Sequence, residues 1–111
     1  MGQVLMRIKG FDGEVELQTD RVIIHRPGVF NMFKYGPNAK REIPLSAISE
    51  IGFVKPLLLG MGEIEFVRSG RSSDERNQAN NVVKFKKNKL VEFERLKEKV
   101  FELIQQYSKQ R

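Results

Sequence analysis

Apolar and polar residues alternate along much of the first 86 residues, which is the period expected of half-buried β-strands. In residues 14–18 Val15 and Leu17 alternate with polar side chains, and in residues 63–67 Ile64 and Phe66 alternate with glutamates. Glycine, proline and aspartate punctuate these runs. The pattern predicts seven short strands, at residues 4–9, 14–18, 21–26, 40–45, 49–54, 63–67 and 82–86.

The end of the chain follows a helical period. Seven apolar residues recur at spacings of three or four and form one stripe. They are Leu90, Phe93, Leu96, Val100, Leu103, Ile104 and Tyr107, and Phe101 falls beside them. Asn88 is the predicted N-cap of a helix over about residues 89–107. The stripe must be covered, so we expect this helix to cover the open end of the strand assembly.

These elements predict one domain over residues 1–111, with strands over about residues 3–87 and one C-terminal helix. The fold class is mainly β with a C-terminal α-helix. Residues 69–81 contain almost no apolar side chain, and we expect a mobile loop there.

Several segments together resemble the bacterial pleckstrin-homology-like domains, and more narrowly a branch often found ahead of a short C-terminal helical (SHOCT) module. The matching segments are residues 10–17, 22–26, 41–48, 62–66, 83–85 and 93–96. The resemblance implies a bent antiparallel barrel of about seven strands capped by one amphipathic helix. The chain ends at the predicted helix, where this family usually continues into the SHOCT module. A fold that hosts many binding roles does not by itself identify a function.

The residues that carry catalysis in other proteins are sparse here. The chain has no cysteine, so a thiolate nucleophile, a disulfide and a cysteine-containing zinc site are all excluded. His25 is the single histidine, and we interpret it as a structural or surface residue. The pairs Glu14/Glu16 and Glu63/Glu65 share strand faces, which we interpret as solvated outer faces. We therefore expect no enzyme activity, no metal, no cofactor and no small-molecule substrate.

The leading hypothesis is a non-catalytic binding or adaptor domain that mediates protein–protein interaction or self-association. Two apolar segments flanked by glycine and proline exceed the needs of one small core, and exposed patches of this kind mark interfaces. The candidate interface residues are Phe30, Met32, Phe33, Tyr35, Leu57, Leu58 and Leu59. The alternative interpretation is that Phe30, Phe33 and Leu58 fill the barrel.

A second hypothesis follows from the charge distribution. The net charge is +6, and the excess comes from two segments. Residues 21–41 hold five basic residues and no acidic one, whereas residues 68–89 hold seven basic and two acidic residues. Peripheral docking to an anionic membrane would use the basic segments 34–41 and 84–89. The candidate contacts are Lys34, Lys40, Arg41, Lys84, Lys86, Lys87 and Lys89.

The lipid-headgroup site of the pleckstrin-homology resemblance does not carry over, because the loop between the first two strands, residues 11–14, is acidic. A third hypothesis is non-specific binding of nucleic acid by the same lysines. Phe85 is predicted to face away from Lys84 and Lys86, so it offers no stacking platform beside them. We expect a cytoplasmic protein, and the membrane hypothesis would place it at the inner face of the membrane.

Overall fold

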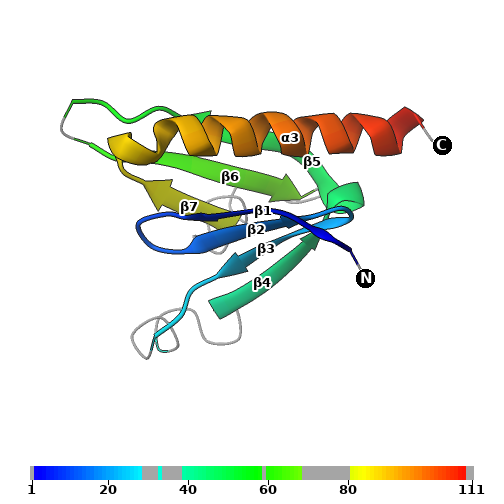
Figure 1. Cartoon of the computed structure of the whole chain (residues 1–111), viewed down its shortest axis with the longest axis horizontal. Helices are drawn as coiled ribbons and strands as arrows, with labels where there is room; N and C mark the ends of the chain where they lie inside the picture. The colour runs from blue at the N-terminus through cyan, green and yellow to red at the C-terminus, as the bar shows by residue number, and fades with distance from the viewer. Residues whose placement is uncertain (1, 29–32, 34–38, 59, 69–80, 110–111) are drawn as a thin grey trace.

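The computed structural model describes residues 2–28, 33, 39–58, 60–68 and 81–109. These residues form seven strands in two antiparallel sheets, followed by one long helix (Figure 1). The first sheet has the order β1 (Val4–Lys9), β2 (Glu14–Gln18), β3 (Arg21–His25) and β4 (Lys40–Pro44). The second sheet has the order β5 (Ile48–Val54), β6 (Gly62–Arg68) and β7 (Val82–Phe85).

The sequence correctly predicted the strands and the fold class, but the described residues do not form a closed barrel. A 3₁₀ turn, η2 (Leu45–Ala47), separates β4 from β5. Because the chain leaves one sheet at this turn and enters the other, no continuous ladder joins the sheets there. The segment predicted to be a mobile loop lies outside the described residues, except for Asn81.

The inner faces of both sheets supply the core as the alternation predicts. Val15 and Leu17 of β2 pack in one cluster with Ile64 and Phe66 of β6, and none of these side chains is exposed. Burial of such side chains stabilises a fold by about 1.5–3 kcal/mol each.

The helix α3 (Leu90–Lys109) contributes its apolar stripe to the same cluster. Phe93, Leu96 and Val100 are fully buried, and Leu103 nearly so. The predicted N-cap is wrong: Asn88 lies inside a 3₁₀ turn, η4 (Lys87–Lys89), that leads into α3. The chain enters the helix through this tighter turn, which begins after Lys86 and takes the place of a side-chain cap.

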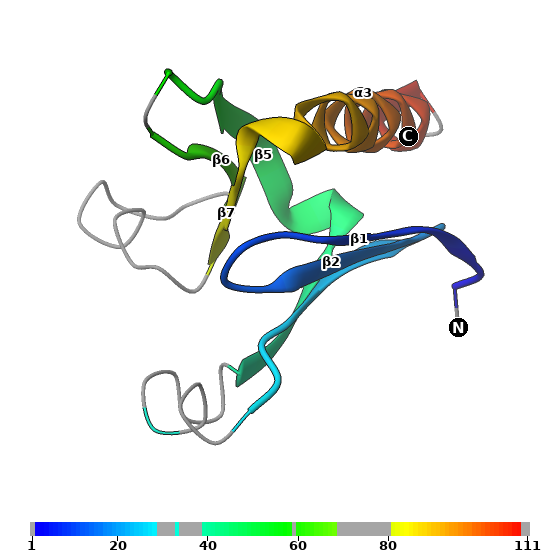
Figure 2. The same cartoon turned by 60° about the vertical axis from the view of Figure 1, so that its left-hand side comes forward.

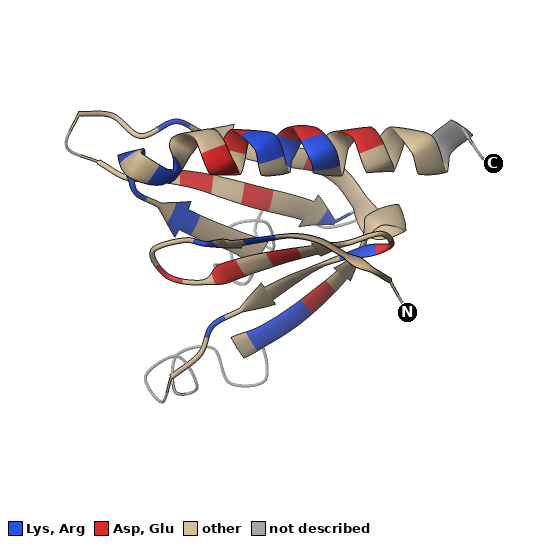
Figure 3. Cartoon of the chain, in the orientation of Figure 1, with Lys and Arg blue, Asp and Glu red and all other residues tan. Residues whose placement is uncertain are grey.

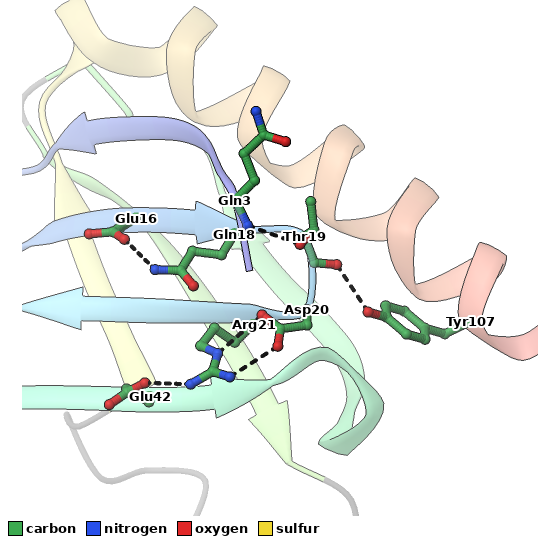
Figure 4. Close-up of polar contacts among 8 residues, drawn as sticks. All are labelled: Gln3, Glu16, Gln18, Thr19, Asp20, Arg21, Glu42 and Tyr107. Carbon is green, nitrogen blue, oxygen red and sulfur yellow. Dashed lines mark hydrogen bonds and ion pairs between the residues drawn. The ribbon is translucent and has the colours of Figure 1, made fainter. Parts of the chain in front are cut away.

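Contacts at both ends of α3 tie it to different sheets. The ring of Phe93 stacks on that of Phe85 in β7, with centroids 4.4 Å apart. Near the other end, the Tyr107 hydroxyl donates to the carbonyl oxygen of Thr19, in the β2–β3 turn, at 3.1 Å (Figure 4). Figure 2 shows α3 almost end-on, in the opening between β5 and β1. The helix therefore covers the open side of the two sheets.

On another side, a buried arginine joins the two sheets. Arg26 follows β3, and its side chain is fully buried. One guanidinium nitrogen donates to the backbone oxygen of Asp12 at 3.0 Å and the other to that of Val82 at 2.6 Å. Asp12 also accepts a hydrogen bond from the backbone N–H of Lys84 at 2.8 Å. The β1–β2 turn is thereby held against β7.

Gly10 allows this close approach. The N–H of Phe11 donates to the carbonyl oxygen of Lys84 at 2.6 Å. A Cβ on Gly10 would lie 2.6 Å from that same oxygen and 2.7 Å from Cγ1 of Val83. Glycine is therefore the one residue that fits here without moving β7.

We expect Gly10→Ala to lower the free energy of unfolding by about 2 kcal/mol, because the added methyl group meets backbone. Urea unfolding followed by circular dichroism measures the change. Gly60→Ala is the control, since nothing lies within 4 Å of its Cβ position, and it should stay within about 0.5 kcal/mol of wild type. Equal stability of the two variants would contradict the close approach.

We expect Arg26→Met to lower the free energy of unfolding by about 3 kcal/mol. The variant keeps the apolar volume but leaves the carbonyl oxygens of Asp12 and Val82 without the guanidinium. Arg95→Met, at an exposed position of α3, is the control and should change stability by less than about 0.5 kcal/mol. If both variants unfolded at the same urea concentration, Arg26 would not hold the sheets together.

Candidate functional site

Glu16 lies on the outer face of the first sheet, as the alternation predicts, but the interpretation of this face as solvated is wrong for it. Its side chain is only 9% exposed. His25 Nε2 lies 3.0 Å from its Oε1. The side chain of Gln18 donates to its Oε2 at 2.6 Å, as Figure 4 shows. Arg7 pairs with both Glu14 and Glu16. Side chains from three neighbouring strands thus cover the carboxylate. The residue pattern of one strand alone does not predict this burial.

These contacts favour the ionised form of Glu16. The hydrogen bond from Gln18, followed by that from His25, holds the pKa of Glu16 below its ordinary value, although burial opposes the shift. The positive charge of Arg7 acts in the same direction. His25 therefore has a structural partner in the fold, consistent with the interpretation made from the sequence.

A hollow of about 440 Å³ beside the β1–β2 turn brings together side chains of both signs. Arg7 and Lys9 line it, but so do Asp12 and Glu14. Glu14 is already paired with Arg7, and Asp12 accepts the backbone N–H of Lys84. The hollow therefore lacks the concentration of free basic side chains that an anion site needs.

Three of the seven predicted interface residues lie in the described part of the chain. Phe33, Leu57 and Leu58 are 87%, 79% and 89% exposed. Phe33 and Leu58 therefore do not fill the core, and that alternative interpretation is wrong for both. The other four, Phe30, Met32, Tyr35 and Leu59, lie outside the described residues.

The predicted basic contacts fall at the ends of two strands. Lys40 begins β4 and is exposed, whereas Arg41 is half-buried and its Nε donates to the side-chain oxygen of Asn81 at 2.5 Å. Lys84, Lys86 and Lys87 are exposed, and Lys89 is half-exposed. The remaining candidate, Lys34, lies outside the described residues. Figure 3 shows the basic residues of β7 and η4 at one end of the molecule, whereas those of β4 lie apart from them on the lower side of the first sheet.

A groove of about 530 Å³ runs between β5 and α3. Ile51 and Ile104 are half-buried apolar residues on its two sides, and Phe101 is 46% exposed beside them. The polar lining residues are Ser49, Glu50, Lys97, Glu98, Glu102 and Gln105. An apolar centre with polar side chains around it is the usual composition of a binding site.

The charge of the groove is opposite to that of the whole chain. Glu50, Glu98 and Glu102 line it against one basic residue, Lys97. Lys97 Nζ lies 4.8 Å from the ring centroid of Phe53, on the core side of β5. Glu102 is paired at its edge with Lys99 at 3.4 Å. The groove therefore has an acidic lining in a chain whose net charge is +6.

The sequence analysis missed this groove. Phe101 was the one indication, because it is apolar and falls off the buried stripe. The position of α3 relative to β5 depends on contacts that both elements make with other strands. The residue pattern of a single segment therefore does not predict the groove.

The chain matches no family model, no curated protein and no solved structure with which we compared it. None of the helices in the described part of the chain has the length and apolar character needed to span a membrane. Among the same residues, no group of three or more histidine or acidic side chains is placed to hold a metal ion.

We expect Glu16→Gln to destabilise the fold at pH 7 by about 1–2 kcal/mol, because a charged acceptor is lost. A group whose pKa is lowered by folding stabilises the protein above its unfolded pKa, and this contribution disappears as pH falls through the folded pKa. The difference between variant and wild type should therefore shrink below about pH 4.3. Urea unfolding from pH 7 to pH 3 measures it.

Glu98→Gln is the control for this measurement, because Glu98 is exposed on α3. It should match wild type throughout the range. A constant difference between Glu16→Gln and wild type at every pH would contradict the role of the carboxylate charge.

Proposed function

We propose that this chain is a non-catalytic protein-binding domain that binds an extended segment of a partner protein in the groove between β5 and α3. The observation that carries the proposal is the position of β5. Among the described strands it is the end strand of the second sheet, and the groove runs along the side of β5 that faces α3.

An end strand carries unpaired N–H and C=O groups that can pair with an added strand. The register of β5 against β6 shifts between Ile48 and Glu50, and the Ser49 hydroxyl donates to the carbonyl oxygen of Val67 at 3.1 Å. From Glu50 to Val54 the pairing is regular. An added segment would align with this regular part, since a bulge interrupts the ladder before it.

The lining determines the chemistry of the partner segment. Ile51, Phe101 and Ile104 offer an apolar contact for one bulky side chain. The acidic residues around them favour lysine or arginine at the flanking positions. The partner is therefore an extended segment with a bulky apolar residue between basic ones.

We also propose that the fold is pleckstrin-homology-like. Two features support the assignment: the order of seven antiparallel strands in two sheets, and the C-terminal helix across their open side. The protein-binding proposal does not depend on it, because it rests on β5 and α3 alone.

The test begins with a library of displayed random linear peptides selected on the wild-type chain. We expect the enriched peptides to be basic with one bulky apolar residue. Phe101→Ala should weaken their binding at least about tenfold, measured by fluorescence anisotropy. Val91→Ala is the matched control, since Val91 is exposed on the same helix but does not line the groove, and its affinity should equal that of wild type.

Hydrogen exchange provides the second measurement. Binding by strand addition should slow amide exchange in the regular part of β5. Enrichment of no peptide, or equal affinity of both variants, would contradict the proposal. Self-association that depends on Phe101 would show that a second copy of the chain occupies the groove instead.

A further inference from the structure

The loop between β5 and β6 lies at the same end of the second sheet as the exit of β7. Gly62, the first residue of β6, pairs with Phe85, the last residue of β7. A Cβ on Gly62 would lie 2.8 Å from Phe85 Cζ and 2.5 Å from the carbonyl oxygen of Val54. The base of the loop is thus packed tightly against β7.

The tip of this loop is apolar and exposed. Leu57 and Leu58 are the two most exposed leucines of the described chain, and Met61 beside them is 40% exposed. The N–H of Gly60 donates to the carbonyl oxygen of Leu57 at 3.3 Å, which closes a turn at the tip. Neither leucine belongs to the core cluster. Adjacent leucines exposed in this way are typical of a surface that contacts another apolar phase.

Lysines surround the base of the loop. They are Lys55, Lys84, Lys86, Lys87 and Lys89. Lys55 pairs with Glu94 at 3.7 Å, Lys89 pairs with Glu92 at 3.1 Å, and Lys84 lies opposite Glu63 in the β6–β7 ladder. Asp12 also lies here, because it accepts the backbone N–H of Lys84, so five positive charges face four negative ones. Figure 3 shows β7 and η4 at this end of the molecule.

An exposed aromatic residue lies at the same end. Phe11, in the β1–β2 turn, is 59% exposed, and Lys86 Nζ lies 5.5 Å from its ring centroid. Its N–H bond to Lys84 keeps it beside β7.

We propose that this leucine–lysine end, formed by Leu57, Leu58, Phe11 and the five lysines, docks on an anionic membrane surface. The leucines enter the boundary between headgroups and acyl chains, and the lysines contact the lipid phosphates. Apolar insertion and electrostatic attraction combine in this way in peripheral membrane proteins.

The surface is distinct from the peptide groove. The groove is lined by the first half of β5 and by residues 97–105 of α3, whereas the leucine–lysine end follows β5 and precedes α3. A projecting loop tip can insert into a bilayer surface. It forms no concave surface in which a folded partner protein would bind. Nucleic acid would use the lysines but would have no need of the leucines.

The chain has no tryptophan, so Leu58→Trp provides a single fluorescent reporter at the tip. Its emission should shift to the blue on addition of vesicles of equal parts phosphatidylcholine and phosphatidylglycerol. Phosphatidylcholine vesicles alone should give a much smaller shift. No shift with the anionic vesicles would overturn the proposal, and equal shifts with both would exclude the electrostatic part.

Co-flotation with the same vesicles tests each component in the full chain. Leu58→Asp should lower the partition coefficient at least about tenfold, and Lys87→Glu about tenfold as well. The matched controls are Val4→Asp, an exposed apolar position at the start of β1, and Arg95→Glu, an exposed basic position on α3. Both controls should float like wild type.

Two results would overturn the proposal. One is flotation that neither Leu58→Asp nor Lys87→Glu reduces. The other is binding to a single-stranded oligonucleotide, without flotation, that Lys87→Glu abolishes and Leu58→Asp leaves intact. The latter would assign the lysines to nucleic acid. Because Phe101 takes no part in membrane docking, failure here leaves the peptide-binding result unaffected.

Discussion

The buried guanidinium of Arg26 is the interaction on which the arrangement of the two sheets depends. A charge removed from water is tolerated only when hydrogen bonds replace its hydration. Arg26 obtains them from the backbone oxygens of Asp12, in the β1–β2 turn of the first sheet, and of Val82, in β7 of the second sheet. The sheets must therefore meet on this side of the molecule, and Gly10 leaves the space for them to do so. On the opposite side the two sheets do not meet, and α3 covers the core there.

The groove follows from how α3 is held. Phe93 fixes one end of the helix on β7 by stacking on Phe85, and Tyr107 fixes the other by its hydrogen bond to Thr19. The helix thus spans from one sheet to the other across the opening. Between these two attachments it lies beside β5 without pairing with it, because a helix has no free backbone groups along its length to continue a ladder. The side chain of Phe101 remains exposed in the groove between β5 and α3.

The two surfaces that we assign differ in charge as well as in place. The groove is acidic and the leucine–lysine end is basic, so each repels the ligand that the other favours. They lie toward opposite ends of β5 and α3, and a bound segment would not cover the tip of the β5–β6 loop. If both proposals hold, one domain of this size would hold a basic protein segment while it rests on an anionic surface.

The sequence by itself determined the elements. Alternation, together with the β-branched run at residues 21–26 and the turn residues between the runs, predicted the seven strands. The apolar stripe predicted the helix to within two residues at its C-terminal end, because burial on one face imposes the helical period on the side chains. Only the tertiary structure decided which polar residues are buried and where a partner has room. In the sequence, Arg26 is one of five basic residues of segment 21–41, and Glu16 was interpreted as an acidic residue on a solvated face. Arg26 is buried against backbone that is distant in the chain, and Glu16 is covered by side chains of its own and the two neighbouring strands. The groove likewise exists only between β5 and α3, and their separation depends on contacts with the other strands rather than on either segment's own residues.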